Sequence, residues 1–140
     1  IRGQFNEALD GSKNLPGIPS ARWLSEIRIE MFKKSNVIRN SFITLQLDNV
    51  FAQNHPFIGY NTETQTPAYT LLNIGYSTQI QRKNKTLFSV SLVGQNIADV
   101  AYQHHLNRLK YGPMNEATGR MGVFNMGRNY SLKINIPFGN

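Results

Sequence analysis

The stretch NYSLKINIPF, at residues 129–138, decides the fold class because every second side chain in it is large and apolar. The apolar positions are Tyr130, Leu132, Ile134, Ile136 and Phe138. The positions between them are mostly polar, and such a period of two is typical of a β-strand with one oily and one wet face. A strand of this kind could cover the core of a soluble sheet, or could stand between hydrocarbon and water.

Four upstream segments repeat this alternation, which predicts further strands at residues 23–32, 41–53, 69–80 and 87–96. In the second of these, Ile43, Leu45 and Leu47 share one face. With a strand stub at residues 1–5, the pattern predicts an all-β protein of about five strands plus the stub. The predicted strands run to about 10 residues or more, whereas strands of globular proteins average about 5–6. Tilted strands that cross a bilayer need about 9–11 residues, so the lengths favour a membrane.

The predicted connections alternate in length along the chain. Three are long, at residues 6–22, 54–68 and 97–128, and the two between them, at residues 33–40 and 82–86, are short. In an antiparallel up-and-down meander, successive connections lie at opposite ends of the sheet, so the long ones should gather at one end. Outer-membrane barrels have short periplasmic turns and long extracellular loops, whereas a soluble sandwich has no reason to sort its loops.

Composition narrows the function classes further. The net charge of +7 would suit an anionic partner such as nucleic acid, but most of the basic residues lie on predicted connections, where a solvated charge is the usual case. No apolar run approaches the roughly 20 residues of a membrane-spanning helix, and there is no cysteine for disulfides or thiolate metal sites. One side of a single predicted strand carries the charged residues Glu26, Arg28 and Glu30. Burying these charges in a dry protein core would cost free energy, whereas exposing them to a water-filled barrel interior would not.

The segments also resemble a known family in their order and spacing. IPSARW at residues 18–23, PFIGYNTETQTPAYTLLNIGYS at 56–77, SVSLVGQNIADVAYQHHLNRLKY at 89–111 and NMGRNYSLKINIPF at 125–138 resemble the C-terminal barrel strands of TonB-dependent outer-membrane receptors. The resemblance covers nearly the whole chain. It implies that residues 1–140 are the C-terminal part of a large transmembrane β-barrel, whose plug domain is not in this chain.

The function implied by the resemblance is active import across the cell outer membrane. The expected cargo is a scarce nutrient, a small molecule or metal chelate, with a ferric siderophore or another iron complex leading. Energy would come from the TonB complex through an N-terminal region missing from this chain. The apolar face of the last strand, defined above from Tyr130 to Phe138, would contact the lipid bilayer and serve as the signal read by the barrel-assembly machinery.

Candidate site residues lie on the longest connection, which the resemblance places outside the cell. There we predict a substrate-contact role for His104, His105 and Arg108. Adjacent histidines point in different directions, and no histidine or acidic partner stands four residues away, so no metal site is expected. The glycine-rich stretch at residues 118–128 lacks the ending of a phosphate loop, and no serine, histidine and acid combination is evident. We therefore expect no enzyme activity, no cofactor and no nucleic-acid partner.

Two alternatives stay open at this stage. The chain could be a soluble basic β domain that binds nucleic acid, stacking bases on aromatic side chains. It could also belong to a passive porin, which has similar strands but no plug. The sequence upstream of residue 1 would separate a porin from an active receptor.

Overall fold

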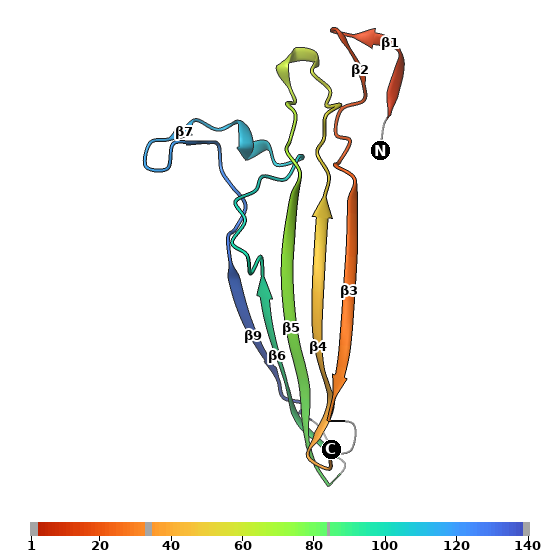
Figure 1. Cartoon of the computed structure of the whole chain (residues 1–140), viewed down its shortest axis with the longest axis vertical. Coiled ribbons are helices and arrows are strands. Elements are labelled where there is room, and N and C mark those ends of the chain that lie inside the picture. Colours follow the sequence, from red (N-terminus) through yellow and green to blue (C-terminus); the bar gives the residue numbers. More distant parts are fainter. Residues whose placement is uncertain (1–2, 33–34, 84, 139–140) are drawn as a thin grey trace. The chain divides into compact units, whose positions relative to one another are not determined.

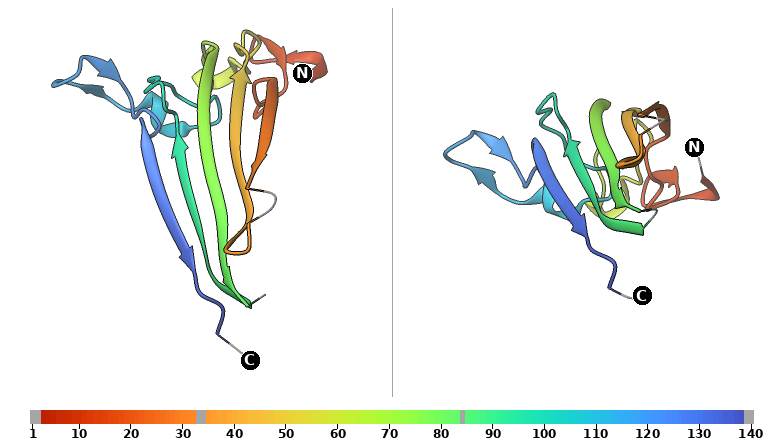
Figure 2. Two further views of the ribbon diagram at one scale, coloured as in Figure 1. Left: turned by 60° about the horizontal axis from the view of Figure 1, so that its bottom comes forward. Right: turned by 90° about the horizontal axis from the view of Figure 1, so that it is seen from below.

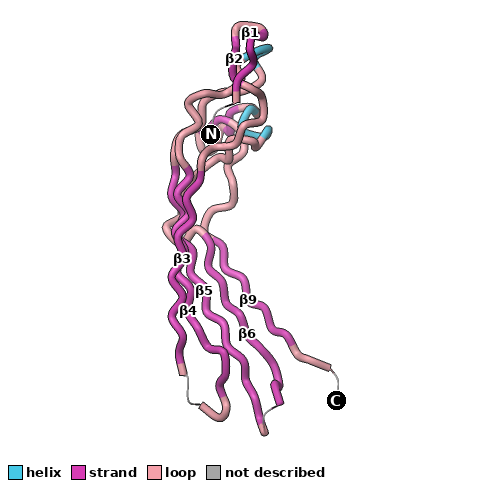
Figure 3. The backbone as a smooth tube through the Cα atoms, turned by 90° about the vertical axis from the view of Figure 1, so that its right-hand side faces the viewer, coloured by secondary structure: helices cyan, strands magenta, loops and turns pink. Residues whose placement is uncertain are grey.

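The computed structural model describes residues 3–32, 35–83 and 85–138. Ile1 and Arg2 of the predicted stub lie outside the described residues, as does part of each short connection. Strands dominate the described chain (Figure 3), and its helical pieces are two short 3₁₀ helices, so the all-β prediction is confirmed. None of the helices in this part of the chain has the length and apolarity that a membrane-spanning helix needs.

Five long strands form one sheet, and they follow one another in space as they do in the sequence (Figures 1 and 2). They are β3 (Arg22–Met31), β4 (Ile38–Val50), β5 (Tyr69–Arg82), β6 (Lys85–Gln95) and β9 (Asn129–Asn135). β6 pairs antiparallel with both β5 and β9. The sheet is therefore the up-and-down meander that the alternating segments predict.

Two small hairpins and two short 3₁₀ helices complete the described chain. They are β1 (Gln4–Leu9) with β2 (Ser12–Asn14), β7 (Met114–Asn115) with β8 (Arg120–Met121), η1 (Gly59–Asn61) and η2 (Arg108–Tyr111). The predicted strand stub at residues 1–5 is in part the beginning of β1, which contains Gln4 and Phe5. This strand pairs with β2 and does not belong to the five-stranded sheet. Asp10 and Gly11 join these two strands with φ values of 46° and 78°, as a two-residue hairpin turn requires.

The strand register places the apolar side chains of neighbouring strands on one common face. Val90 lies opposite Ile134 and Leu92 opposite Leu132, while Tyr76 of β5 lies opposite Leu92 on its other side. This face is open: Leu132 is 63% exposed and Ile134 is 58% exposed. Few of the described apolar side chains are buried, among them Val50, Phe57 and Leu71.

The opposite face of the sheet carries a chain of polar side-chain contacts across several strands. Gln46 Nε2 donates to Glu26 Oε2 at 3.2 Å, and Asn73 Nδ2 donates to Gln46 Oε1 at 2.9 Å. Asn73 Oδ1 in turn accepts from the backbone N–H of Asn96 at 2.9 Å. Arg28 lies on the ring of Phe42, with its guanidinium carbon 3.6 Å from the ring centre. The polar side chains of this face therefore bond to one another from strand to strand along the sheet.

The chain divides into two compact units. One, here called the sheet unit, contains Leu24–Asp48, Leu71–Val100 and Gly127–Asn140. The other, here called the loop unit, contains Ile1–Trp23, Asn49–Thr70 and Ala101–Met126, referred to below as its first, second and third segments. These three segments hold most of the long predicted connections, and they pack with one another. Their gathering at one end of the sheet stays a prediction.

Candidate ligand-binding site

The second segment of the loop unit is closed at its base by a pair of backbone hydrogen bonds. Gln53 N–H donates to Thr66 O at 2.9 Å, and Thr66 N–H donates to Gln53 O at 3.2 Å. The Gln53 side chain also donates to Ile18 O at 3.0 Å, which joins the second segment to the first. Thr66 is buried, so its hydroxyl group has a fixed position inside the loop unit.

The third segment brings a histidine and a lysine to that hydroxyl group. His105 Nδ1 lies 2.8 Å from Thr66 Oγ1, and Lys110 Nζ donates to the same oxygen at 2.8 Å. Lys110 Nζ also donates to Thr64 O at 3.1 Å, and its charge lies 4.9 Å from the centre of the Tyr111 ring. The burial of the Lys110 cation is thereby offset by two oxygen acceptors and an aromatic face.

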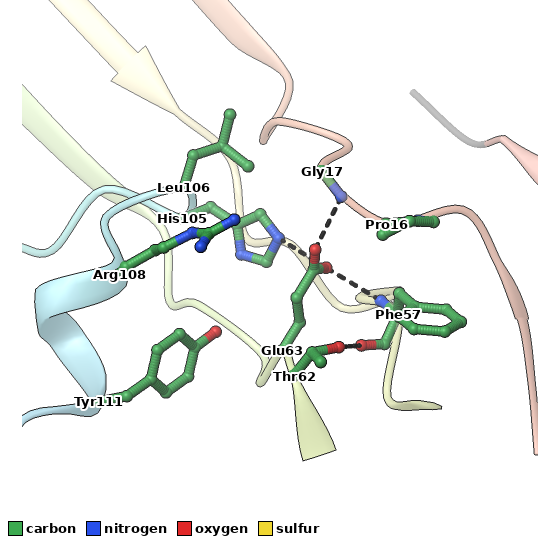
Figure 4. Close-up of a pocket in the computed structure, with 9 residues that line it drawn as sticks. All are labelled: Pro16, Gly17, Phe57, Thr62, Glu63, His105, Leu106, Arg108 and Tyr111. Carbon is green, nitrogen blue, oxygen red and sulfur yellow. Dashed lines mark hydrogen bonds and ion pairs between the residues drawn. The ribbon is translucent and has the colours of Figure 1, made fainter. Parts of the chain in front are cut away.

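Glu63 connects all three segments of the loop unit, as Figure 4 shows. Its Oε1 accepts from Gly17 N–H at 2.7 Å, and its Oε2 accepts from Phe57 N–H at 3.0 Å. The same Oε2 lies 3.5 Å from His105 Nε2. One carboxylate therefore organises backbone from the first and second segments and faces an imidazole from the third.

The hydrogen bonds around His105 indicate one tautomer. Since Lys110 already donates to Thr66 Oγ1, the hydroxyl proton of Thr66 is free to be donated to Nδ1. The ring proton then lies on Nε2 and faces Glu63. Nε2 is buried and no described residue makes a hydrogen bond of normal geometry with it. Burial, followed by the positive charge of Lys110, lowers the pKa of His105, and this outweighs the opposite effect of Glu63.

Acidification should loosen the loop unit through His105. Because the pKa of this residue is lower in the folded protein than its ordinary value of about 6.5, the unfolded loop takes up the proton first as the pH falls. The stability that the loop unit gains from a neutral His105 is complete above about pH 6.5. It is lost progressively as the pH falls below that value, until the pKa of His105 in the folded protein is reached. Proteolytic cleavage within residues 101–126 should accelerate between pH 7.5 and pH 5 in the natural protein, relative to His105→Gln measured at each pH.

The neighbouring histidine supplies the control for this experiment. His104 is exposed, and its backbone N–H donates to Asn125 Oδ1 at 3.0 Å. His104→Gln should keep the pH response of the natural protein. An equal response in the natural protein and in His105→Gln would show that another group titrates.

A pocket of about 590 Å³ lies beside this network in the loop unit (Figure 4). Its apolar lining includes Pro16, Phe57 and Leu106, and its polar lining includes Glu63 and His105 from the network. Ligand pockets typically have volumes of about 300–1,000 Å³ and combine apolar walls with a few polar groups. The size and lining of this pocket suit a small molecule.

The remaining wall of the pocket comes from η2. Arg108 and Tyr111 both line it, and they are three residues apart in a 3₁₀ helix, where side chains at that spacing point to the same side. Asn107 caps this helix, because its side chain accepts from Leu109 N–H at 3.0 Å. Arg108 is exposed, and its guanidinium has no partner within residues 3–32, 35–83 and 85–138.

Two of the three predicted substrate-contact residues line this pocket. His105 and Arg108 line the pocket, whereas His104 is not part of its lining. Sequence reasoning missed Glu63, Thr66 and Lys110. Thr66 is 39 positions from His105 and 44 from Lys110, and no sequence motif connects these residues. The described residues contain no group of three or more histidine, cysteine or acidic side chains arranged to hold a metal ion.

The predicted lipid-facing residues lie elsewhere, in the sheet unit. Tyr130, Leu132, Ile134, Ile136 and Phe138 are all exposed. The first three lie on β9, and their partners on β6 are Gly94, Leu92 and Val90.

Comparison of the chain with protein-family models, curated proteins and solved structures gives no match.

Proposed function

We propose that this chain is the C-terminal part of the β-barrel of a TonB-dependent outer-membrane receptor. Such a receptor imports a small molecule or metal chelate, with a ferric siderophore or another iron complex as the leading cargo. Its energy comes from the TonB complex. The observation that carries the proposal is the open apolar face of a sheet of long strands, opposite a face crossed by bonded polar groups.

Hydrocarbon would be a natural cover for the apolar face. Ile27, Leu132 and Ile134 are each more than half exposed, and contiguous apolar surface of this kind normally marks an interaction site or a membrane contact. β4 and β5 have 13 and 14 residues. At about 3.3 Å per residue these strands are roughly 43–46 Å long, enough to cross a core of about 30 Å at a tilt of about 45°.

The other face suits a wet barrel interior. Glu26, Gln46 and Asn73 are linked to one another by hydrogen bonds, and water could satisfy their remaining donors and acceptors. β3 and β9 lie at the two edges of the sheet, and further strands of a closed barrel would pair with them. The three packed segments of the loop unit would then be extracellular loops, which are the long ones in such barrels.

Cell fractionation tests this proposal directly. The full-length protein should be recovered in the outer-membrane fraction, and its mobility on a gel should change when the sample is heated, because a folded barrel resists the detergent until it is boiled. Recovery in the soluble fraction, without a mobility shift, would contradict the proposal and favour a soluble basic β domain.

TonB dependence separates an active receptor from a passive porin. If the barrel is an active importer, uptake of its cargo should stop when the TonB complex is removed. Uptake that continues unchanged without that complex would indicate a passive pore with the same strands.

A further inference from the structure

We propose that the pocket of the loop unit binds a small monoanionic carboxylate that carries an apolar body, with Arg108 as its charge partner. The binding itself follows from the geometry of the pocket. It does not rest on the proposed function, because the groups that line the pocket are all in this chain. The lining groups differ in whether they are already engaged within the protein or available to a ligand.

The charged groups of the lining show this difference most clearly. Glu63 uses both carboxylate oxygens to accept backbone N–H groups, at 2.7 Å from Gly17 and 3.0 Å from Phe57. His105 faces Glu63 on one side and Thr66 on the other, and its side chain is fully buried. Arg108 alone among the described charged residues of the lining is exposed and lacks a partner. The pocket therefore offers a ligand one available positive charge.

Tyr111 adds a hydrogen-bond donor on the same side of η2. Its phenolic oxygen accepts from Thr64 N–H at 3.1 Å, which fixes the ring and leaves the hydroxyl proton for another acceptor. Arg108 and Tyr111 lie three residues apart on the 3₁₀ helix, so both are presented to the same space (Figure 4). A planar guanidinium with a neighbouring hydroxyl group matches the two oxygens of a carboxylate.

The other lining residues favour a ligand with a single negative charge and an apolar remainder. The Glu63 carboxylate belongs to the same lining, so a dianion such as a phosphate monoester would be repelled more strongly than a monoanion. Pro16, Phe57 and Leu106 provide apolar contact for the remainder of the molecule. A hydrophobic carboxylate satisfies both conditions.

Calorimetric titration of the full-length protein with three probes tests the proposal. The probes are 3-phenylpropionate, its neutral amide 3-phenylpropanamide, and the dianion phenyl phosphate. We expect the carboxylate to bind best and the amide to bind about 10- to 100-fold more weakly, which is the range for a hydrogen-bonded charge pair. Equal binding of acid and amide would overturn the proposal, as would tighter binding of phenyl phosphate.

Variants assign the effect to one side chain. Arg108→Met should reduce the affinity for 3-phenylpropionate about 10- to 100-fold and leave the weak amide binding unchanged, while Arg108→Lys should fall between Arg108→Met and the natural protein. Arg120→Met is the matched control, because Arg120 is in the same segment, stacks on Phe124 and does not line the pocket. A full effect in Arg120→Met, or none in Arg108→Met, would overturn the proposal.

The two proposals fail in different ways. A protein recovered in the soluble fraction that still binds 3-phenylpropionate through Arg108 would overturn the import function and support the pocket assignment. A heat-modifiable outer-membrane protein whose affinity is unchanged in Arg108→Met would overturn the pocket assignment and leave the import function in place.

Discussion

Leu132→Lys is expected to remove most of the folded, heat-modifiable protein from the outer membrane. Leu132 is 63% exposed on the apolar face, in the middle of the pairing between β9 and β6, where its partner is Leu92. If that face contacts lipid, a lysine near the middle of the bilayer costs about 2–4 kcal/mol. The loss should be visible as a smaller folded band and as a lower urea midpoint for the protein that remains.

Ser131→Lys is the matched control for this substitution. Ser131 is the preceding residue of β9 and is exposed on the opposite face, where Lys133 is already present two positions later. A lysine there would face the aqueous interior, so the folded band should stay close to the natural level. A folded band at the natural level in Leu132→Lys, or an equal loss in both variants, would contradict a lipid contact on one face only.

Much of the large sheet could be predicted because its signal is local. Alternating side chains specify which residues of β9 share a face, and the register with β6 follows once Leu132 lies opposite Leu92. The β1–β2 hairpin also has a local signal, since Asp-Gly is strongly favoured in a two-residue hairpin turn. Asp10 and Gly11 nevertheless fall within the long connection predicted at residues 6–22, because the short strands that flank them lack a clear alternation.

The pocket could be predicted only in part, because its contacts are distant in sequence. His105 and Arg108 are predicted by residue type alone. Thr66 is 39 positions from His105 and 44 from Lys110, and no periodicity connects them. Glu63 reaches Gly17 across 46 positions. Only the packing of three separate segments brings these groups together.

A methyl group at Gly122 should damage the pocket more than the same change three residues earlier. Gly122 has a φ of +68°, and a Cβ atom there would overlap the backbone carbonyl group of Lys110 and lie 2.7 Å from Leu109 O. Lys110 would have to move, although its Nζ donates to Thr64 O and Thr66 Oγ1. Gly119 has a similar φ of +64°, but a Cβ atom there would meet no other atom within 4 Å, so Gly119→Ala carries the conformational cost alone.

The two alanine variants therefore separate backbone strain from steric overlap. Gly119→Ala should cost about 1–2 kcal/mol of local stability, the usual cost of a left-handed conformation for a residue with a side chain. Gly122→Ala should cost about 1–3 kcal/mol more, as overpacking does. Cleavage within residues 101–126 should be fastest in Gly122→Ala, and its affinity for 3-phenylpropionate should fall, while the heat-modifiable band persists in both variants. Equal cleavage rates would mean that Lys110 yields to the methyl group without loss of its hydrogen bonds.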